Sequence, residues 1–269
     1  MKRQMVIAVI LLAFFAGASR ETEAQSSPEA GRFDAANRLS WKTEFEDSGT
    51  GDWTKHWFLD GERATVRNTE KGMQLSAGPI EYDYASHCVL WTRQSFKGDV
   101  KIDYDFKRLD TINKHVNILY IQATGIEEGE YSKDIAEWSH LREIPWMSTY
   151  YKNMKLLHIS YAAYPMKGSD EDYVRARRYP IRPDLGFDEI ELPPDTFNTE
   201  LFKPGLLNHI TVIKRGQELH MRVRNVEKTM YFAWDTSAFS PITEGRIGLR
   251  QMFTRSSRYT NFTVSTLNE

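Results

Sequence analysis

Histidine, arginine and tyrosine residues lie on or next to runs of apolar residues that predict β-strands. His87 begins one such run, His158 and Tyr161 lie in another, and Arg250 lies in a third. A histidine can act as a base because it titrates near neutral pH, and an arginine can bind a carboxylate through two parallel hydrogen bonds. A tyrosine hydroxyl can donate a proton to a leaving group. A cation, a base and an acid are the parts that an elimination beside a carboxylate requires.

The alternation of side chains along a strand predicts which face each candidate occupies. His158 faces away from Leu157 and Ile159, which predicts that it points into a groove. Arg250 faces away from Leu249 on the closing strand, and we predict that it holds the carboxylate. Gly248 lies on the face of Arg250, where it would let a ring approach the backbone closely.

A structural role is the alternative for each candidate. His87 and His158 could be buried histidines with satisfied hydrogen bonds, and Arg250 could form a structural ion pair. Tyr161 shares a strand face with Leu157 and Ile159, which favours a core tyrosine. Tyr150 or Tyr151 could then replace it as the acid. The predicted catalytic set is His158, His87, Tyr161 and Arg250, and the predicted substrate-binding set is Trp91, Arg93, Tyr150, Arg177, Arg178 and Gln251.

Most of the chain is predicted to form β-strands, and these strands must position the candidate residues. We expect one all-β sandwich, with hairpins formed by residues 64–76 and by residues 88–109, and no helix beyond a turn or two except near 133–142. Two long excursions, 125–153 and 165–204, are predicted to be loops that wall a binding groove. The other predicted strands are 41–45, 115–124, 155–164, 208–215, 218–226, 230–235, 245–254 and 259–266.

The N-terminal residues predict export from the cytoplasm. Two basic residues and a short apolar stretch are typical of a signal peptide over residues 1–24, with cleavage after Ala24 or, as the alternative, Ala18. Residues 25–38 form a polar leader that we expect to be disordered, and residues 39–269 form the single domain. The protein is therefore predicted to be secreted or periplasmic. Cys88 is the one cysteine, so no intramolecular disulfide can form.

Composition and motifs exclude several classes of function. The 35 Lys and Arg residues nearly balance the 37 Asp and Glu residues, which argues against nucleic acid as a partner. Outside the predicted signal no apolar stretch could span a membrane. Histidine and cysteine clusters and phosphate-binding loops are absent, so no catalytic metal or cofactor is expected, although a structural calcium ion could bind in residues 47–52 or 169–172. Nothing in the sequence indicates the oligomeric state.

Several blocks of the sequence resemble the YesU-like family of bacterial proteins. The most specific block is GRIGLRQM at 245–252 with YTNF at 259–262, supported by HCVLW at 87–91 and LHISY at 157–161. The resemblance implies a concanavalin-A-like jelly roll and a place in the breakdown of polysaccharides that contain uronic acids. Similar proteins include a dehydratase that acts on ulvan oligosaccharides.

Together, chemistry and resemblance predict a lyase or dehydratase, a carbon–oxygen lyase that forms an unsaturated uronic acid on ulvan-like or pectin-like oligosaccharides. A noncatalytic carbohydrate-binding module is the first alternative, since aromatic residues make up 13% of the chain and can stack on sugars. A glycoside hydrolase is the second alternative. Glu189 and Glu191 would share one face of a strand, but they lie in a Pro-flanked segment, and the Glu-x-Asp-x-x-Glu signature is absent.

Overall fold

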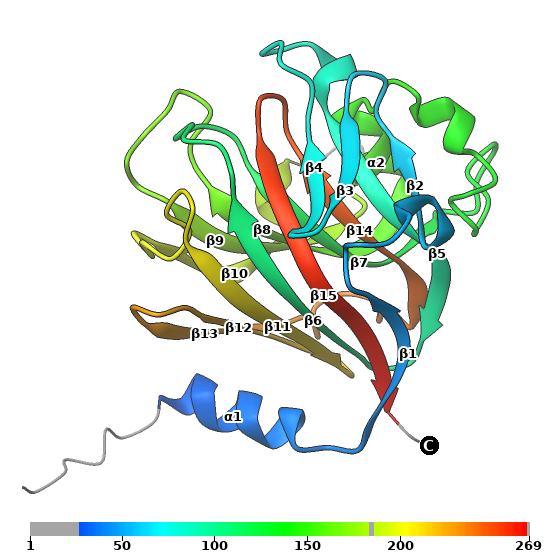
Figure 1. Ribbon diagram of the computed structural model, residues 1–269. Coiled ribbons are helices and arrows are strands. Elements are labelled where there is room, and N and C mark those ends of the chain that lie inside the picture. Colours follow the sequence, from blue (N-terminus) through cyan, green and yellow to red (C-terminus); the bar gives the residue numbers. More distant parts are fainter. Residues whose placement is uncertain (1–26, 183–185, 268–269) are drawn as a thin grey trace, which may run out of the picture.

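Two antiparallel β-sheets, here named sheet A and sheet B, face one another in the computed structural model, which describes residues 27–182 and 186–267 (Figure 1). Sheet A runs in the order β13-β12-β11-β6-β15-β4-β3, with β1 paired to β15, and sheet B runs β10-β9-β8-β7-β14-β5-β2. The strands of sheet A are β1 (Trp41–Asp47), β3 (Thr65–Thr69), β4 (Gly72–Ser76), β6 (Val100–Arg108), β11 (Leu207–Arg215), β12 (Glu218–Arg224), β13 (Thr229–Asp235) and β15 (Ser256–Leu267). Those of sheet B are β2 (Trp57–Asp60), β5 (Cys88–Lys97), β7 (Asn117–Gly125), β8 (Met154–Ala163), β9 (Tyr173–Tyr179), β10 (Glu191–Phe197) and β14 (Glu244–Gln251).

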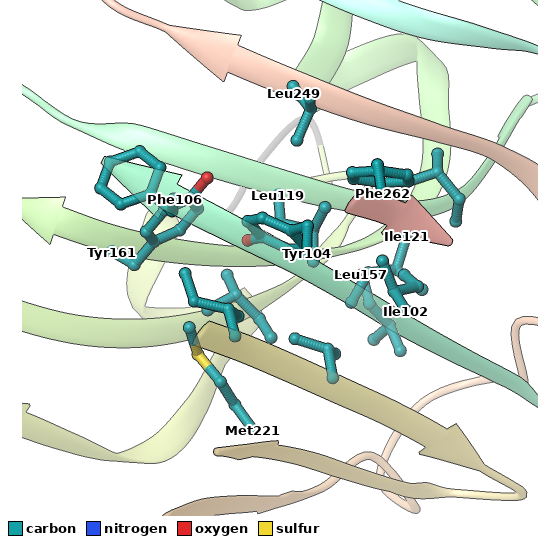
Figure 2. Close-up of a cluster of buried hydrophobic side chains, with 14 of the residues drawn as sticks. Ile102, Tyr104, Phe106, Leu119, Ile121, Leu157, Tyr161, Met221, Leu249 and Phe262 are labelled. Atoms are coloured by element: carbon teal, nitrogen blue, oxygen red, sulfur yellow. The ribbon is translucent and has the colours of Figure 1, made fainter. Parts of the chain in front are cut away.

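Side-chain alternation builds the apolar core between the sheets, and the predicted all-β jelly roll is confirmed. Along β6 the apolar residues are buried and the residues between them are partly exposed, as the sequence predicted. Figure 2 shows these side chains meeting those of sheet B, and the labelled residues are Ile102, Tyr104, Phe106, Leu119, Ile121, Leu157, Tyr161, Met221, Leu249 and Phe262.

One of the two predicted hairpins forms. The strands β3 and β4 pair with each other as expected. The prediction for residues 88–109 is wrong, because β5 lies in sheet B and β6 lies in sheet A, so the turn at Gly98 carries the chain from one sheet to the other. Both strands bury an apolar face, and facing sheets satisfy that need as well as a hairpin does.

A helix, α1 (Pro28–Asn37), replaces most of the predicted disordered leader. The side chain of Ser27 accepts a hydrogen bond from the backbone N–H of Ala30, which is a favourable N-terminal cap. Phe33 is fully buried and contacts Ile213 and Tyr231 on the outer face of sheet A, next to which α1 lies in Figure 1. This apolar contact gives the segment enough buried area to order it. The predicted signal peptide, residues 1–24, lies outside the described residues.

The two long excursions differ from each other. The segment 165–204, predicted to be a loop, contains β9 and β10, which form an edge of sheet B. The segment 125–153 is mostly irregular and includes η3 (Ser139–Arg142) and α2 (Met147–Asn153), while the helix suggested near 133–142 is only this short 3₁₀ turn. The remaining 3₁₀ turns are η1 (Trp53–Lys55), η2 (Tyr84–Ser86) and η4 (Phe187–Ile190), and no helix in the described residues is long and apolar enough to cross a membrane.

Candidate functional site

A cavity of about 280 Å³ opens on the outer face of sheet B, the face turned away from the inter-sheet core. Strands β7, β8, β9 and β14 form its floor, and Met147 at the start of α2 and Phe187 of η4 help to wall it. Its polar lining comes from His158, Ser160, Tyr173, Arg175, Arg177, Tyr179 and Arg250.

Arg250 brings an unpaired charge into this cavity. Its side chain is 2% exposed, and its Nη1 donates a hydrogen bond to the Tyr120 hydroxyl oxygen at 2.5 Å. Its Nε and Nη2 have no hydrogen-bond partner among the described residues. The guanidinium carbon lies 4.9 Å from the centre of the Tyr150 ring, an arrangement that favours the cation. Because arginine stays protonated, the free edge of the guanidinium, formed by Nε and Nη2, is suited to bind a carboxylate.

His158 is hydrogen-bonded to two other residues that line the cavity. Its Nδ1 lies 2.9 Å from the Tyr179 hydroxyl, and its Nε2 lies 2.7 Å from the Ser160 hydroxyl. Burial lowers the pKa of His158 well below its ordinary value, and the nearby charges of Arg177 and Arg250 lower it further. Burial raises the pKa of Tyr179. At neutral pH the pair therefore consists of a neutral imidazole and a protonated phenol, a division that suits a base and an acid.

The other two arginines of the cavity are neutralised by carboxylates of β10. Arg177 donates from Nη2 to Glu191 at 2.7 Å, and Arg175 donates from Nε to Asp195 at 2.6 Å. Within the described residues no carboxylate lines the cavity, which disfavours the two-carboxylate chemistry of a hydrolase. Arg250 is thus the cavity arginine whose charge is left for a ligand.

A buried polar cluster lies behind the cavity. The Asp60 carboxylate accepts hydrogen bonds from Trp91 Nε1 at 2.7 Å, Arg142 Nε at 2.6 Å and the Tyr150 hydroxyl at 3.0 Å. Burial raises the pKa of Asp60, although the charge of Arg142 opposes this shift. Tyr150 and Trp91, predicted to bind substrate, are fully buried here and instead support Tyr120, against which both rings stack.

Gly248 does admit a ring to its face of β14, but the ring belongs to the protein. A Cβ atom at this position would lie 2.5 Å from a ring carbon of Trp91, so only glycine lets the indole lie across the strand. The expectation that the glycine receives a ligand ring is therefore wrong.

His87 is buried near the cavity but does not line it. Neither ring nitrogen has a hydrogen-bond partner among the described residues, and the ring centre lies 4.6 Å from that of Phe253. Burial, helped by the charge of Arg250, lowers the pKa of His87 to about 2. A direct catalytic role for His87 is not supported by this position.

Four other predicted site residues lie elsewhere. Tyr161 is in the inter-sheet core, where its ring contacts Tyr104 and Phe106, and Gln251 points to the same side, with its Nε2 3.4 Å from the Tyr259 hydroxyl. Both have the same strand parity as their apolar neighbours, which is the physical reason. Arg178 faces away from Arg177 and donates to the Ser240 carbonyl, and Arg93 is exposed and donates to the Thr54 carbonyl.

Of the predicted site residues, His158, Arg177 and Arg250 line this cavity, whereas Tyr179, Ser160, Tyr173 and Arg175 line it without having been among the predicted set. A signal for β9 was present, because Tyr173, Arg175, Arg177 and Tyr179 alternate with the small apolar residues Val174 and Ala176. The prolines and charges that flank this strand made the whole segment look like a loop.

The structure leaves the calcium prediction as it stood. Within the described residues no group of three or more acidic, histidine or cysteine side chains is arranged to hold a metal. In the 47–52 turn, Asp47 already accepts hydrogen bonds from Trp57 Nε1 and from the backbone N–H of Gly49.

Comparisons with known proteins agree with this fold. The family model described as a domain of unknown function (DUF1961) matches residues 46–264, whereas no curated protein matches the chain. A Bacillus subtilis protein of unknown function with a galectin-like fold superposes with a TM-score of 0.61 at 17% identity, covering 85% of this chain and all of the other.

Two sugar-bound proteins also share the fold. The lectin UEA-II complexed with galactose has a TM-score of 0.53 at 11% identity and covers 83% of this chain and 98% of its own. The exoplasmic domain of VIP36, bound to Ca²⁺ and Man3GlcNAc, has a TM-score of 0.54 at 12% identity. The match covers 84% of this chain and 92% of the VIP36 domain. At these identities the likeness shows the fold alone. The resemblance to the YesU-like family remains a prediction.

Proposed function

The chain belongs to the DUF1961 family, and we propose that it is a carbohydrate-active lyase or dehydratase acting on oligosaccharides that contain a uronic acid. One observation carries the proposal: the unpaired guanidinium of Arg250 lines the same cavity as the hydrogen-bonded pair of His158 and Tyr179. These three side chains are the cation, base and acid that an elimination requires.

The proposed reaction begins when the uronate carboxylate binds the free edge of Arg250. This contact withdraws electrons from C5 and makes its proton more acidic. It also offsets the positive charge that lowers the pKa of His158, so the bound substrate makes the histidine a stronger base.

Proton transfer then follows the hydrogen bonds of His158. With its own proton on Nδ1, the imidazole donates to Tyr179, and Nε2 accepts the C5 proton once the Ser160 hydroxyl turns away. The C5–H electrons form the C4=C5 double bond, the C4–O bond breaks, and Tyr179 protonates the departing oxygen. The Nδ1 proton of His158 passes to Tyr179, and His158 keeps the abstracted proton on Nε2. Tyr179 thus regains its starting form, and His158 is again neutral but as the other tautomer, which returns to the Nδ1–H form by exchanging protons with water.

The fold gives general support for carbohydrate as the ligand, because two proteins of the same fold hold sugars in the structures cited above. The signal-like residues 1–24 support secretion or export to the periplasm as part of the proposal.

A noncatalytic sugar-binding protein is the second candidate. The observation that favours it is that both ring nitrogens of His158 already have partners within the protein, as in a structural histidine.

Ultraviolet absorbance separates the two functions. A C4=C5 double bond conjugated to a carboxylate absorbs where the intact sugar does not, so purified protein is mixed with a panel of uronate-containing oligosaccharides and followed over time. A rise that Arg250→Ala and His158→Ala abolish, and that the surface variant His209→Ala retains, supports the elimination. Calorimetric binding without any rise moves the assignment to a sugar-binding protein.

A further inference from the structure

Exposed apolar side chains concentrate on two segments of the molecule. Ten large hydrophobic residues are exposed among the described residues, and five of them lie at positions 80–84 and 144–146. Isolated exposed apolar residues are ordinary, whereas a contiguous patch marks a binding surface. The five residues are Ile80, Tyr82, Tyr84, Ile144 and Trp146.

Two rings join these segments. Tyr84 and Trp146 stack with their centres 4.4 Å apart and their planes 25° apart, yet they remain 40% and 49% exposed. Since each ring covers one face of the other, the exposed area lies on their outward sides. Tyr82 is 63% exposed and has a φ of 62°, a conformation that is unfavourable for a residue with a Cβ atom.

The patch adjoins the cavity of Arg250. Trp146 directly precedes Met147, which lines the cavity. The Tyr82 ring centre lies 5.5 Å from that of Phe253, whose neighbour Met252 also lines it. The patch therefore lies close to the cavity, although none of its five residues lines it.

The basic residues that contact the carboxylates of the 80–84 segment are paired, unlike Arg250. Arg63 donates to Asp83 at 2.9 Å, and Lys114 and His115 both contact Glu81, at 3.4 and 3.2 Å. A sugar ring on the patch would meet aromatic faces and no unpaired cation among the described residues.

We propose that Tyr84 and Trp146, with Tyr82, form a stacking subsite for an uncharged pyranose ring that is linked to the uronate held in the cavity. The inference rests on the proposed function for the identity of the neighbouring sugar. The C–H face of a pyranose is apolar and its edge is polar, and aromatic rings with one open face suit such a ligand. The preferred ligand is thus a mixed oligosaccharide rather than a uronic acid alone or a run of uronic acids.

Calorimetry with matched ligands tests this subsite. The probes are glucuronic acid, a disaccharide of glucuronic acid with a neutral pyranose, and cellotetraose as an oligosaccharide without charge. The protein variants are Trp146→Ala, Tyr84→Ala, Arg250→Ala and the control Leu207→Ala, which removes an exposed apolar side chain from β11 of sheet A. Near-ultraviolet circular dichroism checks that each variant is folded.

The expected result is that the disaccharide binds the unchanged protein about tenfold more tightly than glucuronic acid, and that either aromatic variant removes this gain. Both aromatic variants should bind glucuronic acid as the unchanged protein does. A gain that persists in both variants overturns the subsite, as does a shift in their sedimentation that identifies the patch as a contact between copies of the chain.

Failure of the proposed function gives a different pattern. If Arg250→Ala binds glucuronic acid normally, the uronate site is wrong, and the subsite is then judged by cellotetraose alone. Binding of cellotetraose that is lost in Trp146→Ala supports a stacking subsite. If no oligosaccharide binds in a way that depends on Tyr84 or Trp146, the inference is overturned.

Discussion

Charged residues on the outer face of sheet A differ in burial and pairing from Arg250 and His158 on the outer face of sheet B. On sheet A, Lys101 lies 3.6 Å from Asp103, and His209 Nδ1 lies 2.9 Å from Asp105, with all four side chains partly exposed to water. On sheet B, Arg250 and His158 are buried, and two nitrogens of Arg250 have no partner among the described residues. The first arrangement is typical of a solvated surface.

The contrast indicates which face is built to bind. A surface ion pair contributes little to stability, and its loss is tolerated. An unpaired buried charge opposes folding, and such groups concentrate where function needs them. The segment 125–153 contributes to this environment on sheet B, because its buried residues Ile135, Trp138 and Tyr150 cover part of the face.

Replacing Arg250 should give the largest effect. Arg250→Met is expected to weaken binding of uronate oligosaccharides by at least about 100-fold, because it removes a desolvated cation. The free energy of unfolding should stay the same or rise, since the buried charge is gone. Calorimetry measures the binding affinity, and urea denaturation measures the free energy of unfolding. Lys101→Met on sheet A should change neither, and a variant Arg250→Met that binds normally but unfolds easily would make the arginine structural.

The pair of His158 and Tyr179 should affect turnover more than binding. His158→Gln and Tyr179→Phe are each expected to lower kcat by about 10²- to 10⁴-fold while the affinity changes by only a few fold. The double variant should be little slower than either single one, because the two groups act together. Steady-state kinetics measures this, with His209→Gln as the control. Equal losses in affinity and kcat would argue for a binding role.

Gly248→Ala should destabilise the protein by displacing the Trp91 ring, which packs against β14. The added Cβ would collide with the Trp91 ring, and displacing that ring from Asp60 should cost about 1–3 kcal/mol of unfolding free energy. Urea denaturation measures the loss. Gly31→Ala in α1, where nothing lies within 4 Å of the new atom, should stabilise the protein by about 1 kcal/mol. Equal effects at the two positions would contradict the role given to Trp91.

Acid should weaken the protein through the buried histidines His87 and His158. In the folded state the pKa of His87 is about 2 and that of His158 is well below its ordinary value, while the unfolded chain takes up these protons as pH falls through about 6.5. The stability is therefore complete above that pH and decreases below it, by at most about 1.4 kcal/mol per pH unit for each histidine.

The test of this dependence is a series of denaturation curves between pH 7 and pH 5, where carboxylates with ordinary pKa values contribute little. The variant His87→Leu should reduce the slope by up to about 1.4 kcal/mol per pH unit, and the control Leu207→Ala, which removes no titratable group, should leave it unchanged. An unchanged slope in His87→Leu would mean that His87 is not held neutral by burial.

Alternation in the sequence was enough to predict the sandwich and the facing of several residues. It placed Leu157 and Ile159 in the core and His158 on the opposite face, and it set Arg250 apart from Leu249. This works because the side-chain period of a strand depends only on local backbone geometry. The same rule favoured the core for Tyr161, where the structure places it.

Tertiary structure alone decided which groups meet in the cavity. Tyr179 reaches His158 because β9 pairs with β8, and the charges of Arg177 and Arg175 are neutralised because β10 pairs with β9. No described residue does the same for Arg250, whose strand lies between β7 and β5. These contacts join segments far apart in the chain. A periodicity of two residues determines the face of a strand and carries no information about its neighbours.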